Sequence, residues 1–155
     1  PRGSFSPQIT VDAPTLIPDD YVPDLSVRMA LYRRLNDLDE AQDIEGFAAE
    51  LSDRFGPIPE PTQNLLKLIE IKQNALAAQV AKIEVGPRGA LVSFHEDRPP
   101  NVPGLLAYVE RLGATANLRT DSKLVINRNW PDQGSKLNGC LKLSKGLAGL
   151  ARKAG

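Results

Sequence analysis

Apolar side chains in the first half of the chain recur at intervals of three or four residues, the spacing of one face of a helix. The pattern predicts helices over residues 24–38, 40–55 and 60–79. Asp39 fits the N-cap of the second helix, and Gly56, with prolines after it, ends that helix. The apolar faces consist of Val27, Leu31, Leu35 and Leu38, then Ile44, Phe47, Ala48 and Leu51, then Leu65, Leu66, Leu68, Ile69, Ile71, Ala75 and Leu76.

Two segments before the first helix have a different pattern. Residues 8–11 fit a short strand. Pro18 and Pro23 exclude regular helix from residues 16–23, which predicts an extended arm. The arm is expected to lie over the body of the domain through its apolar side chains, Leu16, Ile17, Tyr21 and Val22.

In the second half the apolar period shortens to two, as in strands. Residues 82–94 alternate on both sides of a Gly-Pro-Arg-Gly turn and predict one hairpin, and residues 115–128 predict another. A helix that begins at Asn101 or Pro103 lies between the hairpins, and a last helix starts at Asp132. The order predicts an α+β fold, with N-terminal helices packed on a small antiparallel sheet of two hairpins and with a C-terminal helix.

Length and composition fit a single domain, with 155 residues, 41% hydrophobic and 25% charged. We expect residues 8–155 to form it and interpret residues 1–7 as linker or vector-derived sequence. The chain begins with Pro1 rather than Met, which indicates a fragment of a longer protein. A single Cys140 and the lack of a long apolar run predict a cytoplasmic protein with no membrane partner.

The charge is unevenly distributed, although the net charge is zero. Residues 1–60 carry twelve acidic and five basic side chains, and residues 61–155 carry seven acidic and fourteen basic ones. Net charges of −7 and +7 predict an acidic face and a basic face, each able to attract a partner. One interpretation of the basic half is a nucleic-acid-binding module, although a Trp at a strand–helix junction also fits a core position. Its candidate residues are Arg128, Trp130, Lys136, Lys142 and Lys145.

The sequence carries no motif of a known catalytic centre. His95, beside Glu96 and Asp97, allows a hydrolase interpretation, but no G-x-S-x-G nucleophile motif accompanies it. One His and one Cys do not make a zinc site of the usual ligand types. Nucleotide-binding glycine loops are absent as well. We therefore predict no catalytic residue, no metal site and no cofactor in this chain.

The stretch AELSDRFGPIPEP, Ala49–Pro61, places two carboxylates in an unfavourable position. Glu50 and Asp53 lie three residues apart in the last turns of the second helix, where the helix dipole costs each roughly 0.3–1 kcal/mol. Arg54 offsets part of this cost. The two acids are either exposed side chains whose cost is tolerated, or a pair offered to arginines of another surface. We refer to Glu50 and Asp53 as the acidic pair.

Two runs of sequence resemble a known family. LIPDDYVPDLSVRMALYRRL and ELSDRFGPIPEPTQNLLKLIEIK closely resemble the C-terminal (TRCF) domain of bacterial transcription-repair coupling factors, the Mfd family. The D-Y-V-P-D arm, the L-Y-R-R-L helix and the D-R-F-G-P-x-P turn agree in order and spacing. The resemblance covers roughly Leu16 to Phe94, and beyond Phe94 it rests only on the order of hairpins and helices.

The resemblance implies a regulatory domain without enzymatic activity in a DNA translocase that removes stalled RNA polymerase and recruits UvrA. In this family the motor with its ATP and Mg²⁺, the polymerase-binding module and the UvrB-like module lie upstream. The domain packs on the UvrB-like module of the same chain, masks the UvrA-binding surface and restrains the motor, which itself contacts DNA.

The resemblance also implies roles for particular residues. Family members make the interdomain contact with acids before D-R-F-G, which meet arginines of the UvrB-like module. The matching residues here are Glu50 and Asp53, which the resemblance assigns to an interdomain latch. Residues that support the following turn are Arg54, Phe55, Gly56 and Pro57.

Overall fold

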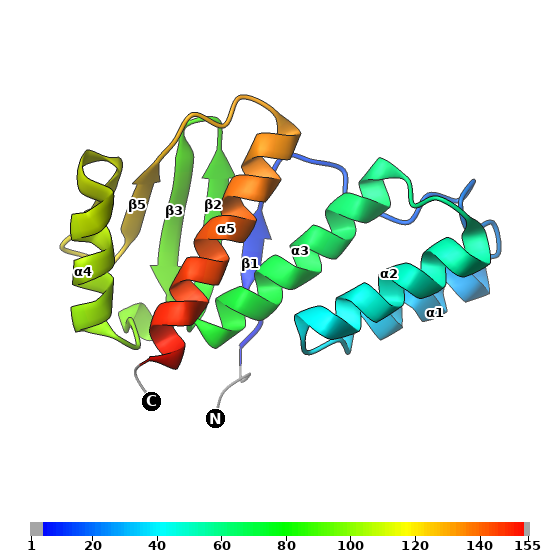
Figure 1. Cartoon of the computed structure of the whole chain (residues 1–155), viewed down its shortest axis with the longest axis horizontal. Helices are drawn as coiled ribbons and strands as arrows, with labels where there is room; N and C mark the ends of the chain where they lie inside the picture. The colour runs from blue at the N-terminus through cyan, green and yellow to red at the C-terminus, as the bar shows by residue number, and fades with distance from the viewer. Residues whose placement is uncertain (1–4, 154–155) are drawn as a thin grey trace.

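A five-stranded sheet and a group of helices beside it form the two parts of the molecule (Figure 1). The computed structural model describes residues 5–153, so residues 1–4 of the predicted linker lie outside the described part. The helices are α1 (Leu25–Asn36), α2 (Ala41–Phe55), α3 (Glu60–Ala77), α4 (Val102–Leu112) and α5 (Gln133–Arg152). The strands are β1 (Gln8–Thr10), β2 (Val80–Gly86), β3 (Gly89–Phe94), β4 (Ala116–Leu118) and β5 (Leu124–Asn127).

The sheet has the strand order β1-β2-β3-β5-β4. Both predicted hairpins are present, because β2 pairs antiparallel with β3 and β4 with β5, and α4 separates them in the chain. The prediction of a wholly antiparallel sheet was wrong in one place: β1 pairs parallel with β2, with Ile9 opposite Ile83. The arm and three helices lie between β1 and β2, and this long connection allows parallel pairing.

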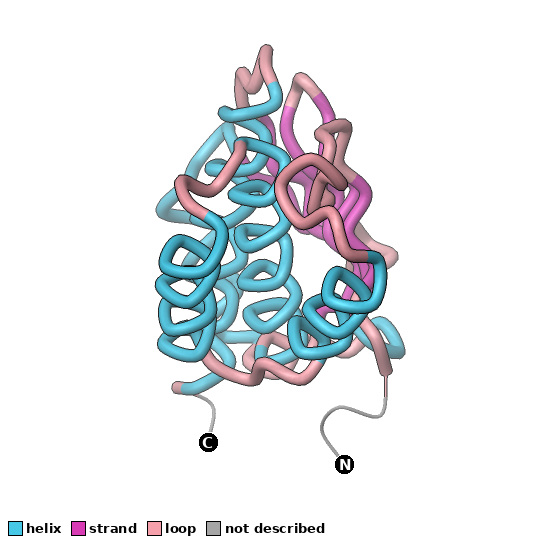
Figure 2. Tube along the Cα trace, turned by 90° about the vertical axis from the view of Figure 1, so that its right-hand side faces the viewer, coloured by secondary structure: helices cyan, strands magenta, loops and turns pink. Residues whose placement is uncertain are grey.

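One face of the sheet is covered by helices and the other is open to solvent (Figure 2). Side chains alternate accordingly along each strand. Ile83, Val92 and Leu124 point toward the helices and are fully buried, whereas Glu84 on the opposite face is exposed. The apolar side chains on the covered face of the sheet therefore form part of the core.

Two apolar cores share helix α3. Its first half packs with α1, α2 and the arm through Leu65 and Ile69, and its second half packs with the sheet, α4 and α5 through Ile71 and Ala75. The prediction that the N-terminal helices pack on the sheet thus holds for α3 only. Helices α1 and α2 lie beyond α3, away from the strands (Figure 1). Periodicity indicates that a helix has an apolar face but not which element covers it.

The Pro-rich arm lies over the helices, as predicted. Two of its four apolar side chains are buried there. Ile17 and Val22 are buried, at 2% and 1% exposure, and Tyr21 is half-buried. The prediction was wrong for Leu16, whose side chain is 42% exposed. Leu16 is held by its backbone instead, because its carbonyl accepts a hydrogen bond from the Thr62 hydroxyl at 3.0 Å.

Several predicted boundaries differ from the structure by one or two residues; helices α1 and α3, for example, end at Asn36 and Ala77 rather than at residues 38 and 79. Glu40, and not Asp39, is the N-cap of α2, and its backbone N–H donates to the Asp43 carboxylate at 3.3 Å. Strand β2 begins at Val80 rather than at Lys82, because Val80 pairs with Phe94 on the far side of an irregularity in the ladder. Helix and strand ends are the least determined part of any sequence pattern.

Helix α5 is continuous in spite of its glycines, and one of them has a packing role. Trp130 is only 8% exposed and lies against Gly139, where a Cβ atom would come within 2.3–2.6 Å of the indole ring. Only Gly allows so close an approach of an aromatic ring to a helix backbone. Gly149 lies on the same helix, but a Cβ built there meets no other atom within 4 Å.

We expect Gly139→Ala to lower the free energy of unfolding by about 1–3 kcal/mol, because the added methyl group overlaps the indole ring of Trp130. Gly149→Ala is the matched control on the same helix and should raise it by roughly 0.5–1 kcal/mol through lower backbone entropy in the unfolded chain. Urea unfolding followed by Trp130 fluorescence measures both changes. Equal effects of the two substitutions would contradict the packing role of Gly139.

Candidate interaction site at the end of helix α2

The acidic pair lies on the solvent side of the last two turns of α2. The opposite face of the helix is fixed in the core by Ile44, Phe47 and Leu51, which are 6%, 3% and 1% exposed. This orientation leaves Asp53 exposed and Glu50 half-buried. The burial pattern thus sets the position of both carboxylates.

Two arginines bind Glu50 within the domain. Arg34 of α1 donates from both terminal nitrogens to the two Glu50 oxygens, at 2.7 Å each. Arg54, one turn further along α2, donates from Nη1 to Glu50 Oε2 at 2.8 Å. Each guanidinium also lies over an aromatic ring, Arg34 at 5.0 Å from the Phe47 centroid and Arg54 at 4.9 Å from that of Phe55. These contacts join α1 to α2 beside the apolar core in which both helices pack.

The hydrogen bonds from Arg34, and then those from Arg54, lower the pKa of Glu50 from its ordinary value of 4.5 to about 2. The Glu50 carboxylate is therefore ionised throughout the neutral range. Asp53 differs from it, because within residues 5–153 no ion pair or side-chain hydrogen bond involves Asp53. The two acids of the pair are thus electrostatically unequal: one is neutralised within the domain and the other is open to a partner.

The turn after α2 depends on Gly56 and on a residue that the sequence analysis treated only as apolar. Gly56 has φ = 89°, a conformation that favours glycine. The Tyr21 hydroxyl of the arm donates to the carbonyls of Gly56 at 2.8 Å and of Leu51 at 3.2 Å. The Tyr21 ring also meets Phe55 edge to face, with centroids 5.8 Å apart. The hydroxyl therefore binds the arm to the end of α2 and gives the Gly56 carbonyl a donor.

The residues expected to support the turn divide into two groups. Phe55 and Gly56 are half-buried and hold the turn, and Pro57, which is exposed, follows Gly56 and prevents continuation of the helix. The Arg54 guanidinium binds Glu50 and also lies over the Phe55 ring, so it contacts the turn only through Phe55. Arg34 and Tyr21 complete the site but were not predicted as site residues, since their contacts depend on how α1 and the arm lie against α2.

The residues of the nucleic-acid interpretation do not form one continuous track. Arg128, Trp130 and Lys142 line a groove between α4 and α5, whereas Lys145 forms an ion pair with Glu70 at 3.4 Å. Lys136 lies in the first turn of α5 and is not among the residues that line the groove. Trp130 is only 8% exposed, so its ring offers little surface on which a base could stack, and its nucleic-acid role stays a prediction.

His95 lies in a setting that does not resemble a hydrolase centre. Its ring is stacked on Phe5 with centroids 4.2 Å apart, and its Nε2 is 3.1 Å from Glu96 Oε1. Within the described residues, no hydrogen bond joins His95 to a serine or cysteine side chain. In the same part of the chain no three His, Cys, Asp or Glu side chains gather as a possible metal site.

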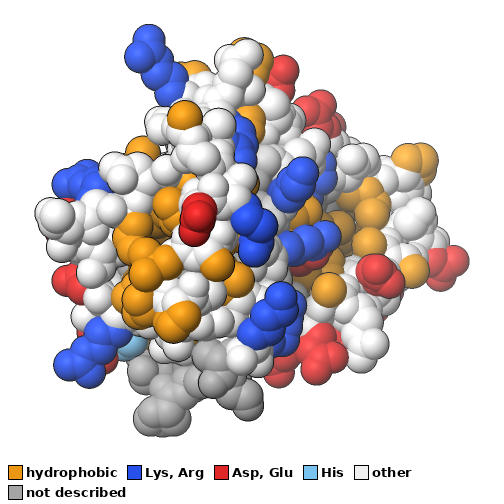
Figure 3. All heavy atoms as spheres, turned by 60° about the vertical axis from the view of Figure 1, so that its left-hand side comes forward, with side chains coloured by type: hydrophobic (Ala, Val, Ile, Leu, Met, Phe, Trp, Pro, Cys, Tyr) orange, Lys and Arg blue, Asp and Glu red, His pale blue; other side chains and the backbone are white. Residues whose placement is uncertain are grey.

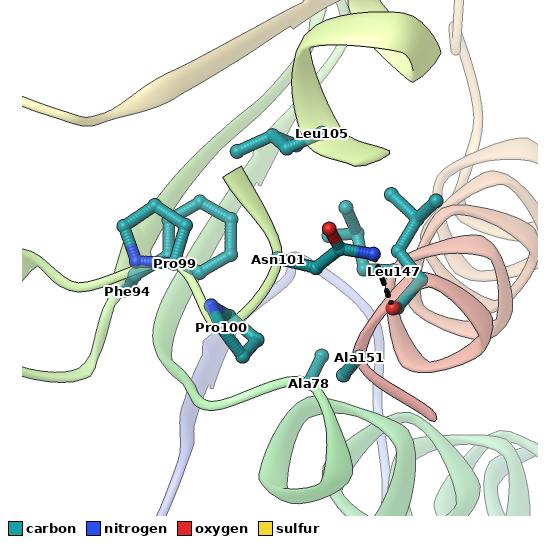
Figure 4. A pocket seen from close by; sticks show the side chains of 9 residues that line it. Ala78, Phe94, Pro99, Pro100, Asn101, Leu105, Leu147 and Ala151 are labelled. Carbon is teal, nitrogen blue, oxygen red and sulfur yellow. Dashed lines mark hydrogen bonds between the residues drawn. The ribbon is translucent and has the colours of Figure 1, made fainter. Parts of the chain in front are cut away.

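An apolar pocket near the end of α5 is too small for a ligand (Figure 4). Its volume is about 10 Å³, roughly the space of one water molecule. Asn101 crosses it and donates from Nδ2 to the Leu150 carbonyl at 2.9 Å, which fixes the start of α4 to α5. None of the helices in residues 5–153 has the length and apolar character needed to span a membrane.

Comparison with known proteins identifies the family. The family model described as the TRCF domain matches residues 11–105. Similar proteins include the transcription-repair-coupling factors of Rickettsia bellii, 31% identical over 121 residues and 78% of this chain, and of Myxococcus xanthus, 30% identical over 125 residues and 81% of this chain. The chain spans only 11% and 10% of the length of these curated relatives.

A solved structure shares the fold of the whole chain. It is the crystal structure of the C-terminal domain of a transcription-repair coupling factor, with a TM-score of 0.81, 17% sequence identity and coverage of 96% of both chains. The architecture is thus that of an α+β domain. Helices α3, α4 and α5 pack on the sheet, and α1 and α2 pack on the first half of α3. The chain belongs to the TRCF domain family. This agrees with the resemblance found in the sequence.

We expect Glu50→Gln to lower the free energy of unfolding at neutral pH by about 0.5–1 kcal/mol, a modest value because the carboxylate is partly solvated. Because the folded-state pKa lies below the unfolded one, the contribution is complete above pH 4.5 and is lost as the pH falls toward 2. Urea unfolding of both proteins between pH 2 and 7 measures the difference. A difference that stays constant over this range would contradict the ion-pair cluster.

Tyr21→Phe should lower the free energy of unfolding by about 1 kcal/mol, because the Gly56 carbonyl loses its donor and the arm loses its hydrogen bond to the end of α2. Tyr108→Phe is the control, since its hydroxyl has no hydrogen bond within the described residues and its loss should change stability little. Thermal unfolding of the two variants gives the comparison. If both variants unfold at the wild-type temperature, the Tyr21 hydroxyl does not stabilise the turn.

Proposed function

We propose that this chain is a regulatory domain, without catalytic activity, of a transcription-repair coupling DNA translocase. The domain packs on the UvrB-like module of its parent protein, masks the UvrA-binding surface and restrains the ATP-driven motor until RNA polymerase is engaged. The motor supplies the contacts with DNA, ATP and Mg²⁺. The observation that supports this proposal is the acidic pair at a rigid helix end, with an ionised Glu50 and an exposed Asp53 that has no ion pair among the described residues.

The geometry supports arginine as the partner residue. An ionised carboxylate has about four positions for hydrogen-bond donors. Arg34 and Arg54 occupy three positions on Glu50, which leaves one for a donor from outside. All positions on Asp53 are open. A guanidinium of the UvrB-like module can therefore bind Asp53 with both nitrogens and share Glu50 with the internal arginines.

The internal arginines also limit the strength of the contact. Arg34 and Arg54 both bind Glu50, so at Glu50 a partner arginine gains attraction only by approaching closely or by displacing one of them. Partly exposed ion pairs contribute roughly 0.2–1 kcal/mol each. Such a contact biases a conformational equilibrium without fixing it, as a releasable autoinhibitory latch requires.

The experiment is calorimetric titration of this chain against the UvrB-like module of its parent protein at low and high salt. We expect binding that weakens with salt, and about fivefold weaker binding for Asp53→Arg, which corresponds to roughly 1 kcal/mol. Glu45→Arg is the matched control, because it changes an exposed acid of the same helix outside the pair. In the full protein, Glu50→Arg/Asp53→Arg should raise UvrA binding and DNA-independent ATP hydrolysis.

Two results would overturn the proposal. One is that Asp53→Arg and Glu45→Arg weaken binding to the UvrB-like module equally, which would show that the module is attracted to the acidic helix as a whole and not to the acidic pair. The other is unchanged UvrA binding and ATP hydrolysis in the double variant of the full protein.

A further inference from the structure

A groove lined by apolar and basic side chains lies between α4, β5 and α5. Its volume is about 540 Å³, within the usual range for ligand-binding clefts. Apolar side chains form most of its walls, among them Leu112, Ile126 and Leu143. Figure 3 shows the face of the molecule that carries α4, where hydrophobic side chains gather and Lys and Arg side chains lie beside them. We call this feature the basic groove.

The charged side chains of the basic groove are all positive. Arg128 and Lys142 line it, and no acidic residue of the described part of the chain does. Arg111 lies close by, with its guanidinium 5.8 Å from the centroid of the Tyr108 ring, which also lines the groove. Within residues 5–153, none of these three cations has an acidic partner, whereas the neighbouring Lys145 is paired with Glu70. The positive charge of the groove is therefore available to a ligand.

The surroundings reinforce this charge. Residues 102–153 contain nine basic and three acidic side chains. Two of the three acids are already engaged: Asp121 binds Arg119, and Asp132 caps α5 by accepting a hydrogen bond from the Ser135 N–H. The whole α4–α5 side thus has a positive potential that attracts an anionic partner.

The groove also offers a neutral donor. The Tyr108 hydroxyl lies close to Gly146 of α5, where a Cβ atom would be 3.3 Å away. Burial raises the pKa of Tyr108, and the nearby Arg128 and Arg111 oppose this rise, so the hydroxyl keeps its proton at neutral pH. In the described part of the chain this hydroxyl makes no hydrogen bond. It can donate to a carboxylate that enters the groove.

The apolar walls distinguish between two anionic partners. Single-stranded nucleic acid needs exposed aromatic faces for its bases. Here Trp130 is buried against Gly139, and the Arg111 guanidinium lies over the Tyr108 ring. A peptide that combines carboxylates with a large apolar side chain fits better, because its apolar group can enter between Leu112 and Leu143 while its acids meet the cations at the rim.

We propose that the basic groove between α4 and α5 is a docking site for an acidic peptide segment that carries one large apolar side chain. Arg128 and Lys142 bind its carboxylates, and the apolar walls hold its anchor residue. The site lies on a different part of the domain from the acidic pair and does not depend on the latch. A regulatory domain with this groove binds a second partner through charge of the opposite sign.

The experiment uses an array of twelve-residue peptides of Asp, Glu and Ser, in which a single Leu, Phe or Trp is moved through the sequence. Binding of this chain to the best peptides is then measured in solution by fluorescence anisotropy. We expect about tenfold weaker binding when the apolar residue is replaced by Ala, or the acids by Asn and Gln. Raising the salt concentration should weaken the binding as well.

Variants of this chain locate the binding site. Arg128→Glu and Lys142→Glu should each weaken binding about tenfold or more. Lys123→Glu is the matched control with the same change in charge, because Lys123 contacts Ser93 on the open face of the sheet, and it should weaken binding less than twofold. Gly146→Leu fills the groove without changing the charge and should abolish binding, with its fold verified by circular dichroism.

Three results would overturn the proposal. The first is an array in which no acidic peptide binds better than its uncharged counterpart. The second is binding that Arg128→Glu and Lys142→Glu weaken no more than Lys123→Glu does. The third is that a twelve-nucleotide oligothymidine binds more tightly than every peptide and that Arg128→Glu and Lys142→Glu both abolish its binding. This result would assign the groove to nucleic acid.

Discussion

Helix α3 is the element on which the arrangement of the whole domain depends, because it contributes to both apolar cores. Leu65 and Ile69 bury one half of it among α1, α2 and the arm, and Ile71 and Ala75 bury the other half against the sheet and α5. A continuous helix transmits orientation between its two halves. The helical group therefore cannot rotate relative to the sheet without exposing part of one core.

This constraint reaches the acidic pair through α2. The packing of α2 on α3 fixes which face of α2 is buried, and the turn at Gly56 joins the two helices directly. The arm adds a second connection, because Tyr21 binds the end of α2 while the Leu16 backbone binds the start of α3 at Thr62. The carboxylates thus lie on a rigid support, which reduces the entropy lost when a partner binds them.

The local features of the fold were predictable from the sequence, and the contacts between distant elements were not. Asp24, Asn101 and Asp132 mark helix starts in the sequence, and each accepts a backbone N–H in the structure, because a cap needs only its own neighbours. The parallel pairing of β1 with β2 and the pairing of Arg34 with Glu50 depend on the packing of separate elements. No period or spacing in the chain encodes that packing.

The cluster around Glu50 changes the physical meaning of the acidic helix end. From the sequence, the two acids differ little and both oppose the helix dipole. In the structure, Arg34 and Arg54 bind Glu50, whereas no cation among residues 5–153 forms an ion pair with Asp53. Asp53 is therefore the residue whose environment improves most when an arginine arrives, although Glu50 makes the stronger contacts. The number of contacts that a charged residue makes within its domain is a poor guide to what it gains from a partner, since a compensated charge has little left to gain.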